Sequence, residues 1–150
     1  MIDRAARDQL ASLVRRFAIG SITNREFEAA MPSSQDAAIG QIEHQVWFFY
    51  DDFQTQRLTG RMALSYGLRR DFARMVLFLK SDQEFLWPWP TFNMKRLAAR
   101  LICALTVGLC RPAFGNRPAA GDLRVWPFLS KNDYHRALKD RHYLSGVVHA

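Results

Sequence analysis

The chain has 150 residues, of which 49% are hydrophobic, 13% aromatic and 23% charged, a composition that excludes a disordered or fibrous chain. Its formal net charge is +7, and this charge is unevenly divided. Residues 1–60 hold six Lys/Arg against eight Asp/Glu, a balance of −2, whereas residues 61–150 hold fifteen against six, a balance of +9. The sequence predicts a globular protein whose second part carries a basic surface.

The sequence shows no segment typical of export or of membrane insertion. Asp3 and Asp8 lie near the N-terminus, where a signal peptide would have an apolar core. The longest nearly apolar stretch, 97–110, has fourteen residues, whereas a membrane helix needs about 20. Cys103 and Cys110 are too far apart on one helix to form a disulfide. We expect reduced thiols in the core of a cytoplasmic protein.

The spacing of apolar residues predicts helices along the first half of the chain. Intervals of three and four residues indicate a helix over 3–18 and the longest helix over about 35–54, capped by Ser33 or Ser34. Between them the sequence Thr-Asn-Arg-Glu at 23–26 matches a capping box, which starts a short second helix.

The helical pattern continues in the second half. A helix is predicted over 66–80, and its last turns are apolar all round, which indicates burial between neighbours. A second capping-box match at 81–84 predicts one or two helical turns before the Trp-Pro-Trp-Pro sequence at 87–90. Another helix is predicted over 92–110.

The C-terminal part contains a loop and one more helix. Residues 111–121 are rich in proline and glycine and are predicted to form a loop that is long for a compact domain. An apolar patch follows at 123–128, and Ser130 with Asp133 predicts the cap of a last helix. The sequence therefore predicts an all-α protein, a single domain over 1–150 that forms a compact bundle of five to seven helices.

Three segments of the chain resemble small soluble bacterial proteins of unassigned function. These segments are Phe17 to Glu28, Trp47 to Phe53 and Leu77 to Asp82. The resemblance covers about residues 10–90. It implies a compact bacterial protein, and it implies no activity, cofactor or catalytic residue.

The densest group of ionisable residues lies on the helix predicted over 35–54 and consists of Glu43, His44, Asp51 and Asp52. Adjacent helical residues point about 100° apart, so Asp51 and Asp52 do not converge easily on one substrate. We interpret the group as charged side chains exposed to solvent. A small enzyme that uses these four residues is a further hypothesis, ranked third after the two given below. No metal, cofactor or catalytic residue is predicted, because no phosphate loop, paired Glu-x-x-His motif or nucleophile elbow occurs.

Basic residues of two predicted helices, together with nearby tryptophans, form the candidate binding surface. They are Arg69, Arg70, Arg74, Trp87, Trp89, Lys95, Arg96 and Arg100. Arginine beside exposed aromatic rings suits an acidic protein surface or single-stranded nucleic acid. The alternative interpretation is that the charges are scattered for solubility and that both Trp rings are buried.

The first function hypothesis is a non-catalytic protein-binding module, of the kind represented by bacterial immunity and adaptor proteins. Such a module docks on a partner, for example a toxin, and neutralises or regulates it. The hypothesis rests on missing catalytic motifs, a compact core, a long loop and segregated charge. The alternative is a nucleic-acid-binding protein that uses the basic surface of residues 61–150, although no helix-turn-helix or RNA-binding signature supports it.

Overall fold

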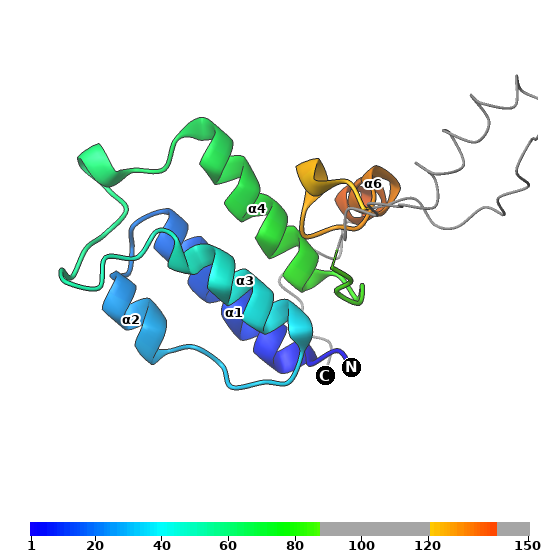
Figure 1. Ribbon diagram of the computed structural model, residues 1–150, viewed down its shortest axis with the longest axis horizontal. Coiled ribbons are helices and arrows are strands. Elements are labelled where there is room, and N and C mark those ends of the chain that lie inside the picture. The colour runs from blue at the N-terminus through cyan, green and yellow to red at the C-terminus, as the bar shows by residue number, and fades with distance from the viewer. Residues whose placement is uncertain (88–120, 141–150) are drawn as a thin grey trace, which may run out of the picture.

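The computed structural model describes residues 1–87 and 121–140, and in these two ranges the chain is helical without a strand (Figure 1). The prediction of an all-α protein is confirmed for these residues. The α-helices are α1 (Arg4–Ala18), α2 (Asn24–Ala29), α3 (Ala37–Trp47), α4 (Tyr66–Lys80) and α6 (Lys131–Lys139), and the 3-10 helices are η1 (Gly60–Met62) and η2 (Leu123–Val125). The predicted helix at 92–110 and nearly all of the predicted loop at 111–121 lie outside the described residues.

The core forms around α1, which packs against α4, α3 and α2, while α4 also contacts α6 (Figure 1). Its largest apolar contributors from α1 and α4 are at most 2% exposed: Leu10, Val14, Phe17, Phe72, Phe78 and Leu79. Leu10, Val14 and Phe17 lie on one side of α1, and Phe72 and Leu79 lie on one side of α4, so the predicted amphipathic faces are buried. Phe78 lies on a different side of α4, which is buried as well. Both helices match their predicted ranges to within one residue.

The C-terminal half of α4 is buried all round, as its continuous apolar run predicts. Every side chain over 75–79 is buried. The Phe78 ring lies 5.1 Å from the ring of Phe128, which follows η2, at an interplanar angle of 79°. Such an edge-on aromatic pair contributes about 0.5–1.5 kcal/mol beyond its buried area. α4 is therefore the helix to which the C-terminal segment attaches.

A buried ion pair joins the ends of three helices. Arg7 Nε lies 2.5 Å from Asp36 Oδ2, and Arg7 Nη2 donates to Asp36 Oδ1 at 3.0 Å. Arg7 Nη1 also donates to the carbonyls of Ser81 (3.1 Å) and Gln83 (2.8 Å). Asp36 in turn caps α3 by accepting from the Ala38 amide at 3.0 Å. The Arg7–Asp36 pair thus links α1 to the start of α3 and to the chain that leaves α4.

The cap of α3 differs from the prediction of Ser33 or Ser34, because Asp36 takes that position. The Ser34 hydroxyl instead donates to the carboxylate of Asp3 at 2.8 Å, and Asp3 itself caps α1. Two carboxylates therefore start neighbouring helices, and Ser34 connects them. An aspartate at a helix start is stabilised by the exposed amides there.

The prediction that a helix over about 35–54 is the longest is wrong, since α3 ends at Trp47 and both α1 and α4 are longer. The buried Asn24 side chain supplies the reason. Its Nδ2 donates to the carbonyls of Asp51 (2.8 Å) and Gln54 (2.9 Å), and its Oδ1 accepts from the Gln56 amide at 2.9 Å. These bonds from α2 satisfy the backbone of the 51–56 loop in a non-helical path.

The predicted helical turns at 81–84 are also wrong, because residues 82–87 have no helical structure. Ser81 caps the C-terminus of α4 instead, and its hydroxyl donates to the Phe78 carbonyl at 2.7 Å. By contrast, the capping box at Thr23 and Glu26 and the Ser130 cap of α6 are confirmed. Of the four caps predicted from local sequence, those at Thr23 and Ser130 are therefore confirmed, and those at Ser33 or Ser34 and at Ser81 are wrong.

The turn after α1 gives a prediction about glycine. Gly20 has φ +70°, and an added Cβ would lie 2.4 Å from Thr59 Cγ2 and 3.1 Å from the Leu58 carbonyl oxygen. Gly60 has φ +56° but open space around it. Both substitutions by alanine strain the backbone, and only Gly20→Ala also meets neighbouring atoms. In urea unfolding we expect a loss of about 2–3 kcal/mol for Gly20→Ala and about 1 kcal/mol for Gly60→Ala. Equal losses would contradict the close approach.

Candidate binding groove

A depression of about 490 Å³ lies between α4 and the segment around η2, with one residue from α3. We call it the α4–η2 groove. It is lined by Gln45, Asp71, Arg74, Met75, Trp87, Leu123, Arg124 and Trp126. The groove therefore combines apolar side chains with one acidic and two basic residues.

Arg74 fixes one wall of the groove. Its side chain is only 11% exposed and lies 2.8 Å from the Asp71 carboxylate. It also donates to the backbone carbonyls of Arg124 (2.9 Å) and Trp126 (3.3 Å). Its guanidinium carbon lies 5.8 Å from the centre of the Tyr134 ring, in cation–π contact. Arg74 therefore attaches η2 and α6 to α4 and holds the groove in shape.

The two tryptophans that line the groove, Trp87 and Trp126, both pack on Phe85. The Phe85 ring lies 6.1 Å from Trp87 and 6.3 Å from Trp126, in edge-on geometry with both. Trp87 is 44% exposed, whereas Trp126 is half-buried. Trp126 Nε1 is buried and has no hydrogen-bond partner among the described residues. The groove therefore offers an exposed tryptophan face supported by packed rings.

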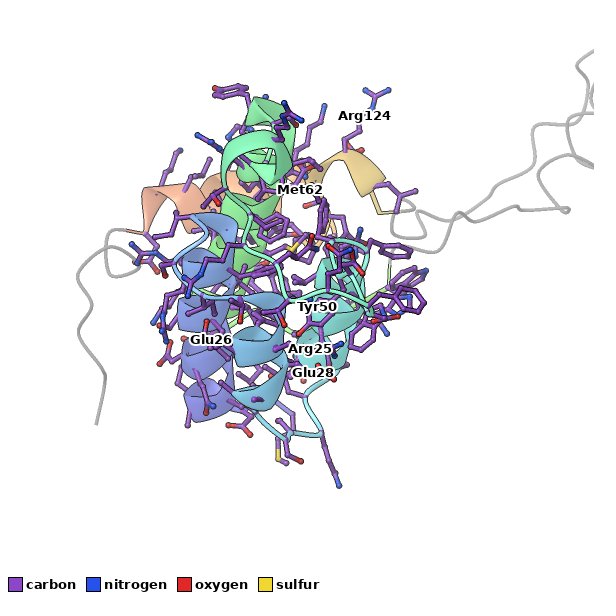
Figure 2. All side chains as sticks on the ribbon, turned by 90° about the vertical axis from the view of Figure 1, so that its left-hand side faces the viewer. Arg25, Glu26, Glu28, Tyr50, Met62 and Arg124 are labelled. Carbon is purple, nitrogen blue, oxygen red and sulfur yellow. The ribbon has the colours of Figure 1, made fainter. Side chains whose placement is uncertain are left out.

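The outer rim of the groove is exposed. Leu123 is 60% exposed, and the neighbouring Arg124 side chain extends away from the body of the protein (Figure 2). Within the described ranges, Arg124 forms no side-chain ion pair or hydrogen bond. The rim thus presents an apolar group and a free cation next to each other.

The sequence-predicted binding residues are found in three situations. Arg74 and Trp87 line the groove. Arg69 and Arg70 are exposed on α4, where Arg69 Nε donates to the Leu64 carbonyl at 3.0 Å. The remaining four lie outside the described residues, namely Trp89, Lys95, Arg96 and Arg100. The structure therefore brings together two of the eight and adds Leu123 and Arg124.

The acidic group considered for catalysis is not connected by hydrogen bonds. His44 is exposed, and its ring packs edge-on against Phe48 at 5.5 Å. Neither Glu43, Asp51 nor Asp52 shares a hydrogen bond or ion pair with His44 in the part of the chain that the structure describes. That part also has no group of three or more His, Cys, Asp or Glu able to hold a metal. The arrangement therefore provides no linked acid–base pair.

Comparisons with family models, curated proteins and solved structures give no match to this chain. Among the described helices, none has the length and apolar character needed to cross a membrane. A functional assignment therefore rests on the surface geometry itself.

Proposed function

We propose that the protein is a non-catalytic binding protein that docks on a partner protein through the α4–η2 groove. The observation that carries this proposal is the exposed Trp87 and Leu123 beside Arg124, around a depression whose wall Arg74 holds in place. Tryptophan and arginine are the residue types that contribute most to protein interfaces. A preformed surface also loses little conformational freedom on binding.

The charges of the groove indicate the chemistry of the partner. Asp71 neutralises Arg74, so Arg124 is the lining cation that is left for an external carboxylate. A partner that inserts an apolar side chain beside Leu123 and pairs a carboxylate with Arg124 satisfies both features. The proposal includes neutralisation or regulation of that partner, as immunity and adaptor proteins act on theirs. We further propose that the protein is bacterial and cytoplasmic. We also propose that the complete chain forms a bundle of five to seven helices with a loop at 111–121.

Co-purification from the bacterial host tests this proposal. The tagged wild-type protein should recover one protein partner at stoichiometric amount. The Leu123→Ser/Arg124→Glu variant should recover at least about tenfold less, because it removes both rim groups. The matched control is Leu138→Ser/Arg136→Glu on α6, where Leu138 is 54% and the Arg136 side chain 77% exposed. Recovery of no partner, or of equal amounts with the rim and control variants, would contradict the proposal.

Nucleic-acid binding is the alternative, favoured by exposed arginines at 70 and 124 that form no ion pair in the described part of the chain. It predicts that the logarithm of the binding constant for a labelled single strand falls steeply and linearly with the logarithm of salt concentration. The protein-docking proposal predicts no such binding in anisotropy measurements at low salt. One anisotropy titration with a labelled single strand therefore distinguishes nucleic-acid binding from protein docking.

A further inference from the structure

A second depression, which shares no lining residue with the α4–η2 groove, lies at the C-terminal end of α3. Its volume is about 500 Å³, and its walls come from the chain after α3 and from the turns that lead into α4. Phe48, Phe53 and Met62 line it and are 71%, 97% and 55% exposed. We call it the Phe53 pocket. Large apolar side chains left in water around one depression are typical of a binding site.

The charged residues that line the Phe53 pocket are both acidic. Asp51 and Asp52 contribute to its wall, which contains no Lys, Arg or His. One Asp51 oxygen, Oδ1, accepts from the amides of Phe53 (2.9 Å) and Gln54 (3.2 Å), which fixes the carboxylate, and Oδ2 has no partner within 1–87 and 121–140. Asp52 is exposed and forms no ion pair in those ranges. Arg25 lies beside Asp52, because its Nη2 donates to the Asp52 backbone carbonyl at 2.5 Å, but its ion pair is with Glu28 at 3.3 Å. The pocket therefore presents two carboxylates that form no ion pair in the described ranges.

Hydrogen bonds from α2 hold the backbone that forms the wall of the Phe53 pocket. Asn24 bonds the backbone of the 51–56 loop at three points. The Tyr50 hydroxyl donates to the Asn24 carbonyl, and Figure 2 shows Tyr50 next to Arg25 and Glu28. Burial, together with the nearby Glu28 carboxylate, raises the pKa of Tyr50 to about 12, so its hydroxyl stays protonated and keeps donating. The backbone that carries the two carboxylates is therefore fixed by hydrogen bonds.

Aromatic rings and free carboxylates in one pocket suit a cation with an apolar stem. The face of a phenylalanine ring attracts a cation, and desolvation strengthens this attraction. A guanidinium group is planar, stacks on aromatic faces and pairs with carboxylates through two parallel hydrogen bonds. Its three-carbon stem packs against apolar side chains such as Met62. An anionic or neutral side chain would leave both carboxylates without a counter-charge.

We propose that the Phe53 pocket binds an arginine side chain of a partner protein. The guanidinium lies against the rings of Phe48 and Phe53 and pairs with the carboxylates of Asp51 and Asp52. This inference goes beyond docking at the α4–η2 groove, because the two sites have separate residues and separate tests. Asp51 and Asp52 thus act as binding residues and not as the acid and base of a reaction.

A peptide titration tests this inference on the full chain. The probe is the blocked tripeptide acetyl-Leu-Arg-Leu-amide, added to ¹⁵N-labelled protein and followed by amide chemical shifts. We expect a Kd on the order of 1 mM, as befits a single anchoring side chain. The shifted amides should be those of residues 48–53 and 62. The same peptide with citrulline, which is neutral and nearly the same shape, should bind at least about fivefold more weakly.

Matched variants assign the effect to the pocket. Asp52→Asn should weaken binding about fivefold, since the exposed carboxylate loses its charge while its size is kept. Phe53→Ser should weaken binding by a similar factor through loss of ring contact. The first control is Glu84→Gln, which changes an exposed carboxylate that lies 3.7 Å from the N-terminal amine of Met1. The second control is Ile19→Ser, which changes an apolar residue that is 73% exposed. Both controls should bind the peptide as the wild type does.

Three results would overturn the inference. One is equal binding of the arginine and citrulline peptides, which would indicate an apolar site. Another is the absence of shifts at residues 48–53. The third is a concentration-dependent dimer in sedimentation that Asp52→Asn dissociates, which would assign the pocket to a second copy of this chain. Because the citrulline comparison uses the wild-type protein, it holds even where a variant unfolds.

Discussion

Replacing Arg7 by methionine is expected to lower the free energy of unfolding by about 3–5 kcal/mol, measured by urea unfolding at pH 7. Arg7 is fully buried, and its guanidinium satisfies the Asp36 carboxylate and two backbone carbonyls of the 81–83 segment. Methionine fills a similar volume but removes the counter-charge of the buried Asp36 carboxylate, which keeps only the amides of Asp3 and Ala38. It also removes the donor to the Gln83 carbonyl. Removal of one member of a buried ion pair costs far more than loss of an exposed pair.

Arg15→Met on the same helix is the matched control for Arg7→Met. Arg15 is exposed, so the same chemical change should alter stability by less than about 0.5 kcal/mol. Similar losses for the two variants would show that the Arg7–Asp36 pair does not stabilise the fold.

The Arg7–Asp36 pair should also make the stability of the protein depend on pH in the acidic range. Burial alone would raise the pKa of Asp36, but hydrogen bonds from Arg7 and from the amides of Asp3 and Ala38 together lower it below 3.8. A lowered folded-state pKa contributes stability that is complete above the unfolded value and is lost as pH falls through the folded value. The free energy of unfolding, measured in urea from pH 7 to pH 2.5, should therefore decrease below about pH 4. The decrease should be smaller in Asp36→Asn, which cannot titrate.

Asn24→Ala is expected to have the next largest effect, a loss of about 2–4 kcal/mol in urea unfolding. The Asn24 side chain is fully buried and makes three hydrogen bonds to the backbone of the 51–56 loop. Alanine leaves two carbonyls and one amide of that loop without their partners. The Gln56 amide should also lose protection in hydrogen exchange, because Asn24 Oδ1 is its acceptor.

The control for Asn24→Ala is Asn132→Ala, an exposed asparagine on α6 that should change stability by less than about 0.5 kcal/mol. The alanine variant at position 24 should also bind the arginine tripeptide more weakly, since the 51–56 loop carries the carboxylates of the Phe53 pocket. A stable Asn24→Ala protein with an unchanged Gln56 exchange rate would contradict the role of Asn24 as the anchor of this loop.

Helix bounds are predictable where local sequence decides them. α1 and α4 match their predicted ranges because the apolar period of each helix coincides with the face that packs. The caps at Thr23 and Ser130 involve residues only three positions apart. In such segments the sequence pattern and the tertiary contacts favour the same structure.

Other bounds depend on side chains that lie far away in the sequence. The apolar residues of 48–53 continue the pattern of α3, but Asn24 binds the backbone beyond residue 50. Likewise the carbonyls of Ser81 and Gln83 bind Arg7, which is more than 70 positions earlier, instead of taking part in a helical turn. Propensity cannot predict such tertiary hydrogen bonds.

The sequence contains an unused signal for the burial of Arg7. Arg7 lies three and seven positions before Leu10 and Val14, on the apolar face of α1. A charge at such a position indicates a buried ion pair. Its partner Asp36 could not be predicted, because no local spacing connects residues 29 positions apart.

The candidate groove is predictable only in part. Arg74 and Trp87 belong to the predicted binding set, but Leu123 and Arg124 reach the groove from a segment about 50 positions away. Residue composition marks 123–128 as apolar without indicating where it packs. The placement results from the contacts of Phe128 with Phe78 and of Arg74 with the η2 backbone.

Site-specific photocrosslinking in living cells of the native host is the sharpest test of docking at the α4–η2 groove. A benzophenone amino acid is placed at position 123, on the rim of the α4–η2 groove, and at position 138 on α6 as a comparably exposed control. We expect one protein-sized adduct from position 123 that resists nuclease treatment, and none from position 138. A nuclease-sensitive adduct at position 123, or identical adducts from both positions, would contradict docking at this groove.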